Sequence, residues 1–195
     1  MPEIVVATNN AGKVVEFREL LGESGLTVIT PGDLGYEFEV DETGRTYVEN
    51  ARLKAREALR LTGLPSLGDD SGIEVDALDG APGLRSARYA GEGANDRDNR
   101  ELLLSQLDGV NERSARFRCL LVLAFTAADE HVFEGVCEGE IARREAGDLG
   151  FGYDPIFVPE GYEQTMAELA PKVKNRISHR GRAVAAALPA LRSLA

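Results

Sequence analysis

Two adjacent aspartates, Asp69 and Asp70, follow a short apolar segment in the sequence Leu67-Gly68-Asp69-Asp70-Ser71-Gly72. Neighbouring carboxylates repel each other unless a cation or a shared proton lies between them, so a fold that keeps this pair must supply one. We expect the pair on a turn flanked by glycines rather than on a solvated helix face. Such a placement predicts a divalent metal site and metal-assisted chemistry.

Length and charge restrict the classes of protein that fit. The chain has 195 residues, of which 43% are hydrophobic, so one domain over residues 1–195, with or without two lobes, is expected. The net charge of -11 argues against a nucleic-acid or anionic-membrane surface, since those partners need broad basic patches, so neither is expected. Residues 171–195 contain no acid, and their basic residues and histidine are Lys172, Lys174, Arg176, His179, Arg180, Arg182 and Arg192. A small anionic substrate is therefore compatible with an acidic chain.

Compartment and redox state follow from the start of the chain and from its cysteines. The first residues, Met1-Pro2-Glu3, lack the basic n-region of a signal peptide, and no apolar stretch approaches membrane-spanning length. We therefore expect a soluble cytoplasmic protein. Cys119 and Cys137 lie in two apolar runs, and buried reduced thiols are the favoured interpretation, with a cross-strand contact as the alternative.

The first half of the chain predicts a strand, a polar turn, a helix and a second strand. Residues 4–7 are a strand-like apolar run, and Val14, Phe17 and Leu21 recur at helical spacing. Residues 26–29 predict the second strand. A polar connector, residues 37–45, leads to a helix over about 46–61 on which Lys54 shares a face with small and aromatic residues.

The second half predicts another helix, a hairpin and a terminal helix. Asn95 or Asp96 would cap a helix that carries several leucines. Strands over 117–125 and 132–141 would pair antiparallel through a turn at 128–130. A glycine-rich loop, 147–154, precedes a final helix from Ser178 toward Leu194 with a kink at Pro189. The predicted fold is α/β, with a mixed central sheet flanked by helices.

The polar turn at residues 8–13 combines a hydroxyl, two amides, a glycine and an ammonium group at a strand-to-helix junction. Unpaired backbone N–H groups and the positive end of the helix dipole attract anions at such a junction, which predicts phosphate binding. The spacing of a Walker A loop is absent. An ordinary capped turn with a surface lysine fits the segment equally simply.

Further charged groups surround the helix over 46–61. Glu39, Asp41 and Glu42 precede it, where they would bring another carboxylate toward a metal or remain solvated. Lys54 lies on a partly apolar helix face, so its side chain either extends to water or reaches an anion.

Two later segments carry recognition chemistry. Residues 150–155 combine glycines, two aromatic rings and a carboxylate, which suits stacking on a flat heterocycle, although the rings would also pack onto a core. Residues 174–180 place several donors where we expect the final helix to begin. Cations are unfavourable at a helix N-terminus, so a bound anion or base carbonyl would explain why they lie there. For His179, a purely structural role is the alternative. No zinc spacing or Ser-His-Asp motif is present, so Ser71 is interpreted as a binding hydroxyl rather than a nucleophile.

Taken together, five motifs resemble those of the inosine triphosphate pyrophosphatase family, also called Ham1-like or non-canonical purine nucleoside triphosphate pyrophosphatases. They are T-N-N-A-G-K at 8–13, D-D-S-G at 69–72, G-A-P-G-L-R-S-A-R-Y-A-G at 80–91, F-G-Y-D-P at 151–155 and I-S-H-R-G at 177–181. The similarity runs through the whole chain in the same order. It departs at Asp148-Leu149, where the family's loop is usually richer in glycine.

The resemblance implies two lobes around a nucleotide-binding cleft, a homodimer, and Mg²⁺-dependent hydrolysis of inosine, deoxyinosine and xanthosine triphosphates to monophosphate and pyrophosphate. It implies Asp70 as the general base, with Lys54 acting on the phosphates beside it, and magnesium held by Glu42, Asp69 and Asp70, where Asp41 could replace Glu42. The phosphate site would comprise Thr8, Asn9, Asn10, Ala11, Gly12 and Lys13. The nucleoside site would comprise Ser71, Phe151, Gly152, Tyr153, Asp154, Lys174, His179 and Arg180.

Two other readings of the sequence compete with this one. A Maf-type nucleotide pyrophosphatase acting on other modified triphosphates would share an α/β cleft and carboxylates, but I-S-H-R and F-G-Y-D-P favour the inosine family. A non-catalytic nucleotide-binding module could dispense with the acidic pair, so the presence of Asp69, Asp70 and Lys54 together favours an enzyme.

Overall fold

The chain divides into two compact units in a computed structural model that describes residues 2–22 and 24–192. Unit 1 contains the described residues up to Asp70, residues 119–135 and the residues from Arg180 onward; unit 2 contains residues 71–118 and 136–179. The single domain over 1–195 stays a prediction.

The strands of the described residues form a mixed sheet in the order β2-β1-β3-β4-β5-β6. Strand β1 (Glu3–Ala7) pairs in parallel with both β2 (Thr27–Ile29) and β3 (Ser66–Val75), whereas β5 (Glu130–Ile141) pairs antiparallel with β6 (Phe157–Pro159). Strand β4 (Ser114–Ala124) is joined to its neighbour β5 by a short turn, a connection that only antiparallel strands allow. The predicted mixed sheet and hairpin are therefore confirmed.

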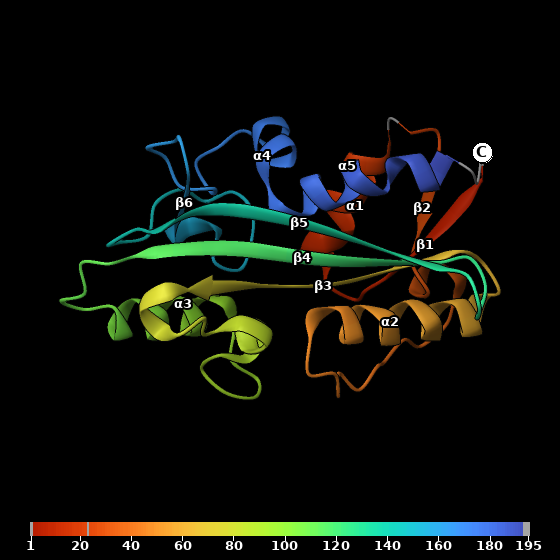
Figure 1. The fold of residues 1–195 in the computed structure, drawn as a ribbon, viewed down its shortest axis with the longest axis horizontal. Helices are drawn as coiled ribbons and strands as arrows, with labels where there is room; N and C mark the ends of the chain where they lie inside the picture. The colour runs from red at the N-terminus through yellow and green to blue at the C-terminus, as the bar shows by residue number, and fades with distance from the viewer. Residues whose placement is uncertain (1, 23, 193–195) are drawn as a thin grey trace. The chain divides into compact units, whose positions relative to one another are not determined.

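In unit 1, helices cover both faces of the sheet. Helices α1 (Ala11–Gly22) and α5 (His179–Leu191) lie on one face and α2 (Tyr47–Thr62) on the other (Figure 1). Strand β4 shows why, because its side chains alternate. Leu121 and Leu123 belong to the core cluster that contains α1 and α5 residues, and Val122 and Ala124 to the cluster that contains α2 residues.

The start of α2 and its contact with β3 are both set by local sequence. The Thr46 hydroxyl accepts a hydrogen bond from the Glu49 N–H and caps the helix. Gly68 faces α2 so closely that a Cβ there would lie 2.0 Å from the Ala51 carbonyl oxygen. Only glycine permits this approach, which brings the following aspartates beside the α2 face that carries Lys54.

Unit 2 is built around one apolar cluster. Leu103 of α3 (Asp96–Gln106), Ile73 of β3 and Phe157 of β6 are fully buried in it. Asn95 caps α3 in a capping box with Asp98, as one of the two predicted caps. The remaining helix is α4 (Pro171–Ile177), and the 3₁₀ turns of the two units are η1 (Gly32–Leu34), η2 (Asp76–Leu78), η3 (Gly83–Arg88) and η4 (Asp154–Ile156).

One local prediction was wrong. Asp69 and Asp70 lie inside the continuous strand β3 rather than on a turn, because cations from other elements compensate their charge. The final helix predicted from Ser178 is confirmed as α5, which begins at His179, whereas the short helix α4 that ends before the extended residue Ser178 was not predicted. Pro189 lies inside α5, its kink stays a prediction, and Leu194 lies outside the described residues.

Two negative findings concern the described residues. None of their helices is both long and apolar enough to cross a membrane. Cys119 and Cys137 are both buried free thiols, which confirms the favoured interpretation.

Candidate active site

Asp69 is the centre of a buried charge cluster in unit 1. The Arg180 Nε donates to its Oδ2 atom at 2.9 Å, the Lys13 ammonium pairs with Oδ1, and the Cys119 thiol donates to Oδ2 at 3.2 Å. Burial alone would raise the pKa of Asp69, but Arg180 and Lys13 outweigh it and hold that pKa well below its usual range. Asp69 is therefore a fixed anion that is already neutralised by its own chain.

Arg180 joins this cluster to α1. Its guanidinium is 1% exposed, donates to Asp69 and Glu16, and lies over the Phe17 ring with 5.6 Å between the Arg180 Cζ and the ring centroid. The sequence placed Arg180 at the nucleoside. That role stays a prediction, but these contacts favour a role in holding Asp69.

Asp70 points to a different set of groups from those around Asp69. Its Oδ1 accepts from the Lys54 ammonium at 3.0 Å and its Oδ2 from the Asn50 amide at 3.2 Å. Burial raises the pKa of Asp70 despite the nearby Lys54. A buried carboxylate with a raised pKa is a better proton acceptor than an ordinary exposed aspartate.

Lys54 bridges two carboxylates and so resolves the two alternatives that its helix face left open. Its ammonium lies 2.7 Å from the Glu42 Oε1 and 3.0 Å from the Asp70 Oδ1, and it donates to the Asp69 carbonyl at 3.1 Å. Burial would lower the pKa of Lys54, but Asp70 and Glu42 outweigh it and raise that pKa. Lys54 is a half-buried cation paired with carboxylates rather than a side chain that extends to water.

The polar turn before α1 has the predicted strand–turn–helix geometry. Asn10 accepts from the Lys13 N–H at 3.0 Å through its side chain, and Thr8 accepts from the Asn10 N–H at 3.1 Å. Asn9, Asn10 and Ala11 are exposed, while Thr8, Gly12 and Lys13 are half-buried. An exposed helix start beside a lysine is suited to a phosphate.

In unit 2, the predicted recognition loop is ordered around Asp154. This buried carboxylate accepts from the Phe151 N–H at 2.9 Å and pairs with the Lys174 ammonium at 2.5 Å. The Lys174 ammonium also lies 5.1 Å from the centroid of the half-buried Phe151 ring. The Phe151 ring is thus half-buried beside a cation, and its stacking on a base stays a prediction.

Other predicted nucleoside residues are more deeply placed. Tyr153 lies in the core of unit 2 and its hydroxyl donates to the Ser86 carbonyl at 2.8 Å, so it anchors the loop to that core. The His179 ring is buried and stacks on Phe117 with centroids 4.7 Å apart. Ser71 is half-buried within β3. Contacts of these three residues with a nucleoside stay predictions.

The placement of Lys174 overturns one sequence argument. Lys174 and Arg176 lie in the last turn of α4, where the helix dipole favours cations, and not in the first turn of a terminal helix. Their position therefore needs no bound anion to explain it. The contact of Lys174 with Asp154 is what ties it to the recognition loop.

The Ham1 family profile matches residues 4–190. The chain belongs to the Ham1 family. A dITP/XTP pyrophosphatase of Methylococcus capsulatus is 50% identical to it over 98% of this chain and 97% of that protein. A solved HAM1 protein of Coxiella burnetii superimposes with a TM-score of 0.87 at 43% identity, covering 99% of this chain and 100% of that one. The Staphylococcus aureus Ham1 protein gives 0.85 at 41% identity, over 98% of each chain. The family and the α/β fold class expected from the motifs are confirmed.

A metal site in this Ham1 chain would need ligands beyond its own side chains. No three His, Cys, Asp or Glu side chains in residues 2–22 and 24–192 converge as a ready-made cage. Glu42 and Asp70, however, are neighbouring carboxylates, since both pair with the Lys54 ammonium, and this one cation leaves the pair with a net negative charge. Magnesium typically takes one or two carboxylates and completes its shell with water and substrate phosphates, so this pair fits it.

Sequence reasoning missed three residues that contact Asp69, Asp70 or Arg180. Asn50 lies one helical turn before Lys54 and on the same face, a spacing that could have marked it. Glu16 is an acid between the apolar positions Val14 and Phe17, an anomaly that could also have been noticed. Cys119 carried no signal, because a cysteine in an apolar strand is normally a core residue.

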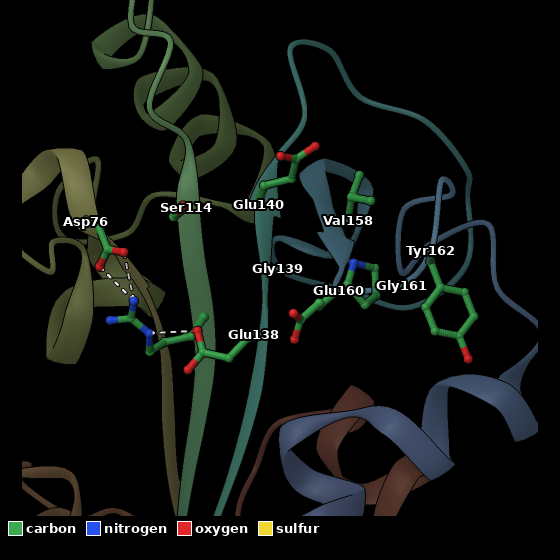
Figure 2. Close-up of a pocket in the computed structure, with 11 residues that line it drawn as sticks. Asp76, Ser114, Glu138, Gly139, Glu140, Val158, Glu160, Gly161 and Tyr162 are labelled. Atoms are coloured by element: carbon green, nitrogen blue, oxygen red, sulfur yellow. Dashed lines mark hydrogen bonds and ion pairs between the residues drawn. The ribbon is translucent and has the colours of Figure 1, made fainter.

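Figure 2 shows a polar pocket of about 530 Å³ in unit 2. Arg116 is paired there with Asp76 at 2.7 Å and Glu138 at 3.0 Å, and the acids Glu140 and Glu160 also line the pocket. Its lining is net negative and its one cation is already paired. A triphosphate would be repelled, so the Ham1 nucleotide site is not assigned to this pocket.

Proposed function

We propose that this chain hydrolyses non-canonical purine nucleoside triphosphates, namely the inosine, deoxyinosine and xanthosine compounds, to the monophosphate and pyrophosphate. The observation that carries the proposal is Asp70, a buried carboxylate held by Lys54 and Asn50 beside the neutralised Asp69. Membership of the Ham1 family, with a relative named dITP/XTP pyrophosphatase, supports the substrate class. The biological role that follows is cleansing of the nucleotide pool.

The proposed reaction is attack of water on the α-phosphorus. The water oxygen forms a new bond to the α-phosphorus, the bond between that phosphorus and the α–β bridging oxygen breaks, and pyrophosphate leaves. Asp70 would accept the proton of the water, a form of help that is typically worth about 10²–10⁴-fold. Lys54 would stabilise charge on the phosphate oxygens, and the helix start at residues 8–13 would hold the outer phosphates.

Magnesium is part of the proposal, with Glu42 and Asp70 as the residues that would hold it. When bound, the ion would neutralise charge on the phosphate oxygens. The sequence also predicted Asp69 as a magnesium ligand. Its carboxylate is bound by Arg180, Lys13 and Cys119, so we propose instead that Asp69 positions these three side chains. Homodimer formation and a cytoplasmic location stay predictions.

Base selection is proposed for the loop of unit 2. Phe151 would stack on the purine, while Gly152, Asp154 and Lys174 would fix the ring and its edge contacts. A site that donates to a 6-oxo group leaves that donor unpaired when a 6-amino group binds, which costs about 1–3 kcal/mol. Adenine would thereby be rejected.

The two other readings from the sequence now have less support. Family membership favours the Ham1 activity over a Maf-type one. A binding module would have no use for a carboxylate such as Asp70, which is held by the half-buried Lys54.

Our first expected result is that inosine and xanthosine triphosphates release pyrophosphate much faster than ATP does. The measurement incubates the protein with Mg²⁺ and a panel of nucleoside triphosphates and identifies the products by chromatography. Orthophosphate as the first product, or equal turnover of ATP, would contradict the proposed function. Binding of the nucleotides without any product would favour the binding module.

The second expected result concerns the metal. Removal of divalent cations with EDTA should abolish turnover and added Mg²⁺ should restore it. Glu42→Gln should raise the Mg²⁺ concentration needed for half-maximal rate by about tenfold or more, since even outer-shell partners of a metal are worth about 10–100-fold. Asp41→Asn is the matched control, because Asp41 is exposed and lies next to Glu42 in sequence. The reverse pattern would transfer the ligand role to Asp41.

A further inference from the structure

We propose that helix α3 sets base selectivity by holding Gly152 between Asp96 and Arg100, which act as positioning residues for the recognition loop of unit 2. This inference rests on the proposed function and deepens it. Neither Asp96 nor Arg100 lies in the sequence motifs that marked the nucleoside site.

Both polar backbone groups of Gly152 are bound by side chains of α3. The Gly152 N–H donates to the Asp96 Oδ2 at 2.8 Å, and the Arg100 Nη1 donates to the Gly152 carbonyl at 2.8 Å. Asp96 and Arg100 are four residues apart on the helix and therefore share one face. The two bonds hold the peptide groups on both sides of the Gly152 Cα.

Gly152 is the position in the loop where such a constraint has the greatest effect. Its φ is +60°, a value that glycine adopts readily. Glycine also adopts many other values, so the residue itself does not fix this conformation. It follows Phe151, the proposed stacking ring, and precedes Tyr153, which is anchored in the core by its bond to Ser86. Rotation about Gly152 would move the Phe151 ring relative to the anchored part of the loop.

Arg100 is itself held in place by a second carboxylate. Glu145 accepts from the Arg100 Nε at 3.0 Å and from Nη2 at 3.2 Å, which leaves Nη1 aimed at Gly152. This fork uses the planar geometry of a guanidinium, which lysine cannot reproduce. Gly152 is only half-buried, so water would satisfy its backbone groups if the helix did not. The two hydrogen bonds from Asp96 and Arg100, here called the clamp, therefore order the loop. They are not needed to satisfy backbone groups that burial would otherwise leave unpaired.

The experiment compares kcat/KM for inosine triphosphate and for ATP in the wild type and in Arg100→Ala, Asp96→Ala and Asp96→Asn. We expect each alanine variant to lower the ratio of the two values by roughly tenfold, chiefly through a higher KM for inosine triphosphate, since small displacements of a recognition group are costly. Asp96→Asn should retain most of the selectivity, because the amide oxygen still accepts from Gly152. This rescue separates the hydrogen bond from the charge that Asp96 also places in the first turn of α3.

Arg97→Ala is the matched control, because Arg97 lies on the same helix but is exposed and pairs with Glu101. It should leave the selectivity ratio unchanged. Amide hydrogen exchange provides a second readout that does not need activity: the peptide covering residues 150–154 should exchange faster in Arg100→Ala and not in Arg97→Ala.

The outcomes separate the two proposals. A wild type that does not discriminate between the two nucleotides, or that releases no pyrophosphate, would overturn the proposed function and the clamp with it. If the wild type is selective but the alanine variants lower kcat/KM equally for both substrates, or for neither, the clamp alone is overturned. Unchanged exchange of residues 150–154 in Arg100→Ala would also count against the clamp.

Discussion

Asp70→Asn should reduce turnover of inosine triphosphate by about 10²–10⁴-fold while the protein stays folded. An amide has the shape of the carboxylate but cannot accept the proton of the attacking water. The fold should tolerate the change, because the new side chain still offers an oxygen to the Asn50 amide and Lys54 retains its pairing with Glu42. The measurement is kcat for pyrophosphate release, with circular dichroism and a thermal melt to check the fold.

The matched control for this variant is Asp33→Asn. Asp33 is a surface aspartate of unit 1 that pairs with Arg18 and accepts from the Thr30 N–H, so its replacement removes a carboxylate without touching the site. It should leave kcat unchanged. Near wild-type turnover in a folded Asp70→Asn variant would exclude Asp70 as the base and would move attention to Glu42.

The parts of the fold that were predictable from the sequence are those with a local cause. Apolar residues at helical spacing identified α1 and α2, and Asn95 was one of the two caps expected for α3. The alternation in β4 and β5 identified the hairpin. In each case a few neighbouring residues decide the conformation.

The surroundings of the acidic pair could not be predicted in the same way. Glycines beside two aspartates normally indicate a turn, yet β3 runs straight through them. The cations that make this tolerable come from far away: Lys13 is 56 positions from Asp69 and Arg180 is 111 positions from it. Pairing over such separations leaves no periodic pattern in the sequence. The adjacent aspartates therefore indicated that a cation lies near Asp69, and we interpreted it as a metal ion rather than as Lys13 and Arg180.

Helix α4 was missed for a related reason. Residues 171–177 span only seven positions and include three basic residues, so they show no helical periodicity of apolar residues. This short helix carries Lys174, which reaches Asp154, and α5 begins just after it at His179. The tertiary contact of Lys174 therefore accompanies a short helix that propensity does not predict.

Arg180→Ala should lower the free energy of unfolding by about 3–5 kcal/mol, the typical cost of breaking a buried ion pair from one side. The guanidinium is 1% exposed and neutralises both Asp69 and Glu16, so its removal leaves two carboxylates buried with less compensation. Because Asp69 adjoins Asp70, the kcat/KM values for inosine triphosphate and ATP should fall by similar factors. The sequence motifs alone suggested a different result, a loss of selectivity through a missing contact with the base.

Two variants distinguish these mechanisms. Arg182→Ala, on the same helix and exposed, should leave stability and both rates unchanged. Adding Glu16→Gln to Arg180→Ala should recover part of the lost stability, because it removes one of the two stranded charges, and a contact between Arg180 and the base predicts no such recovery. The measurements are urea denaturation and the ratio of the two kcat/KM values. A fall in that ratio with unchanged stability would place Arg180 at the base, whereas a loss of stability with an unchanged ratio would establish that Arg180 acts through Asp69.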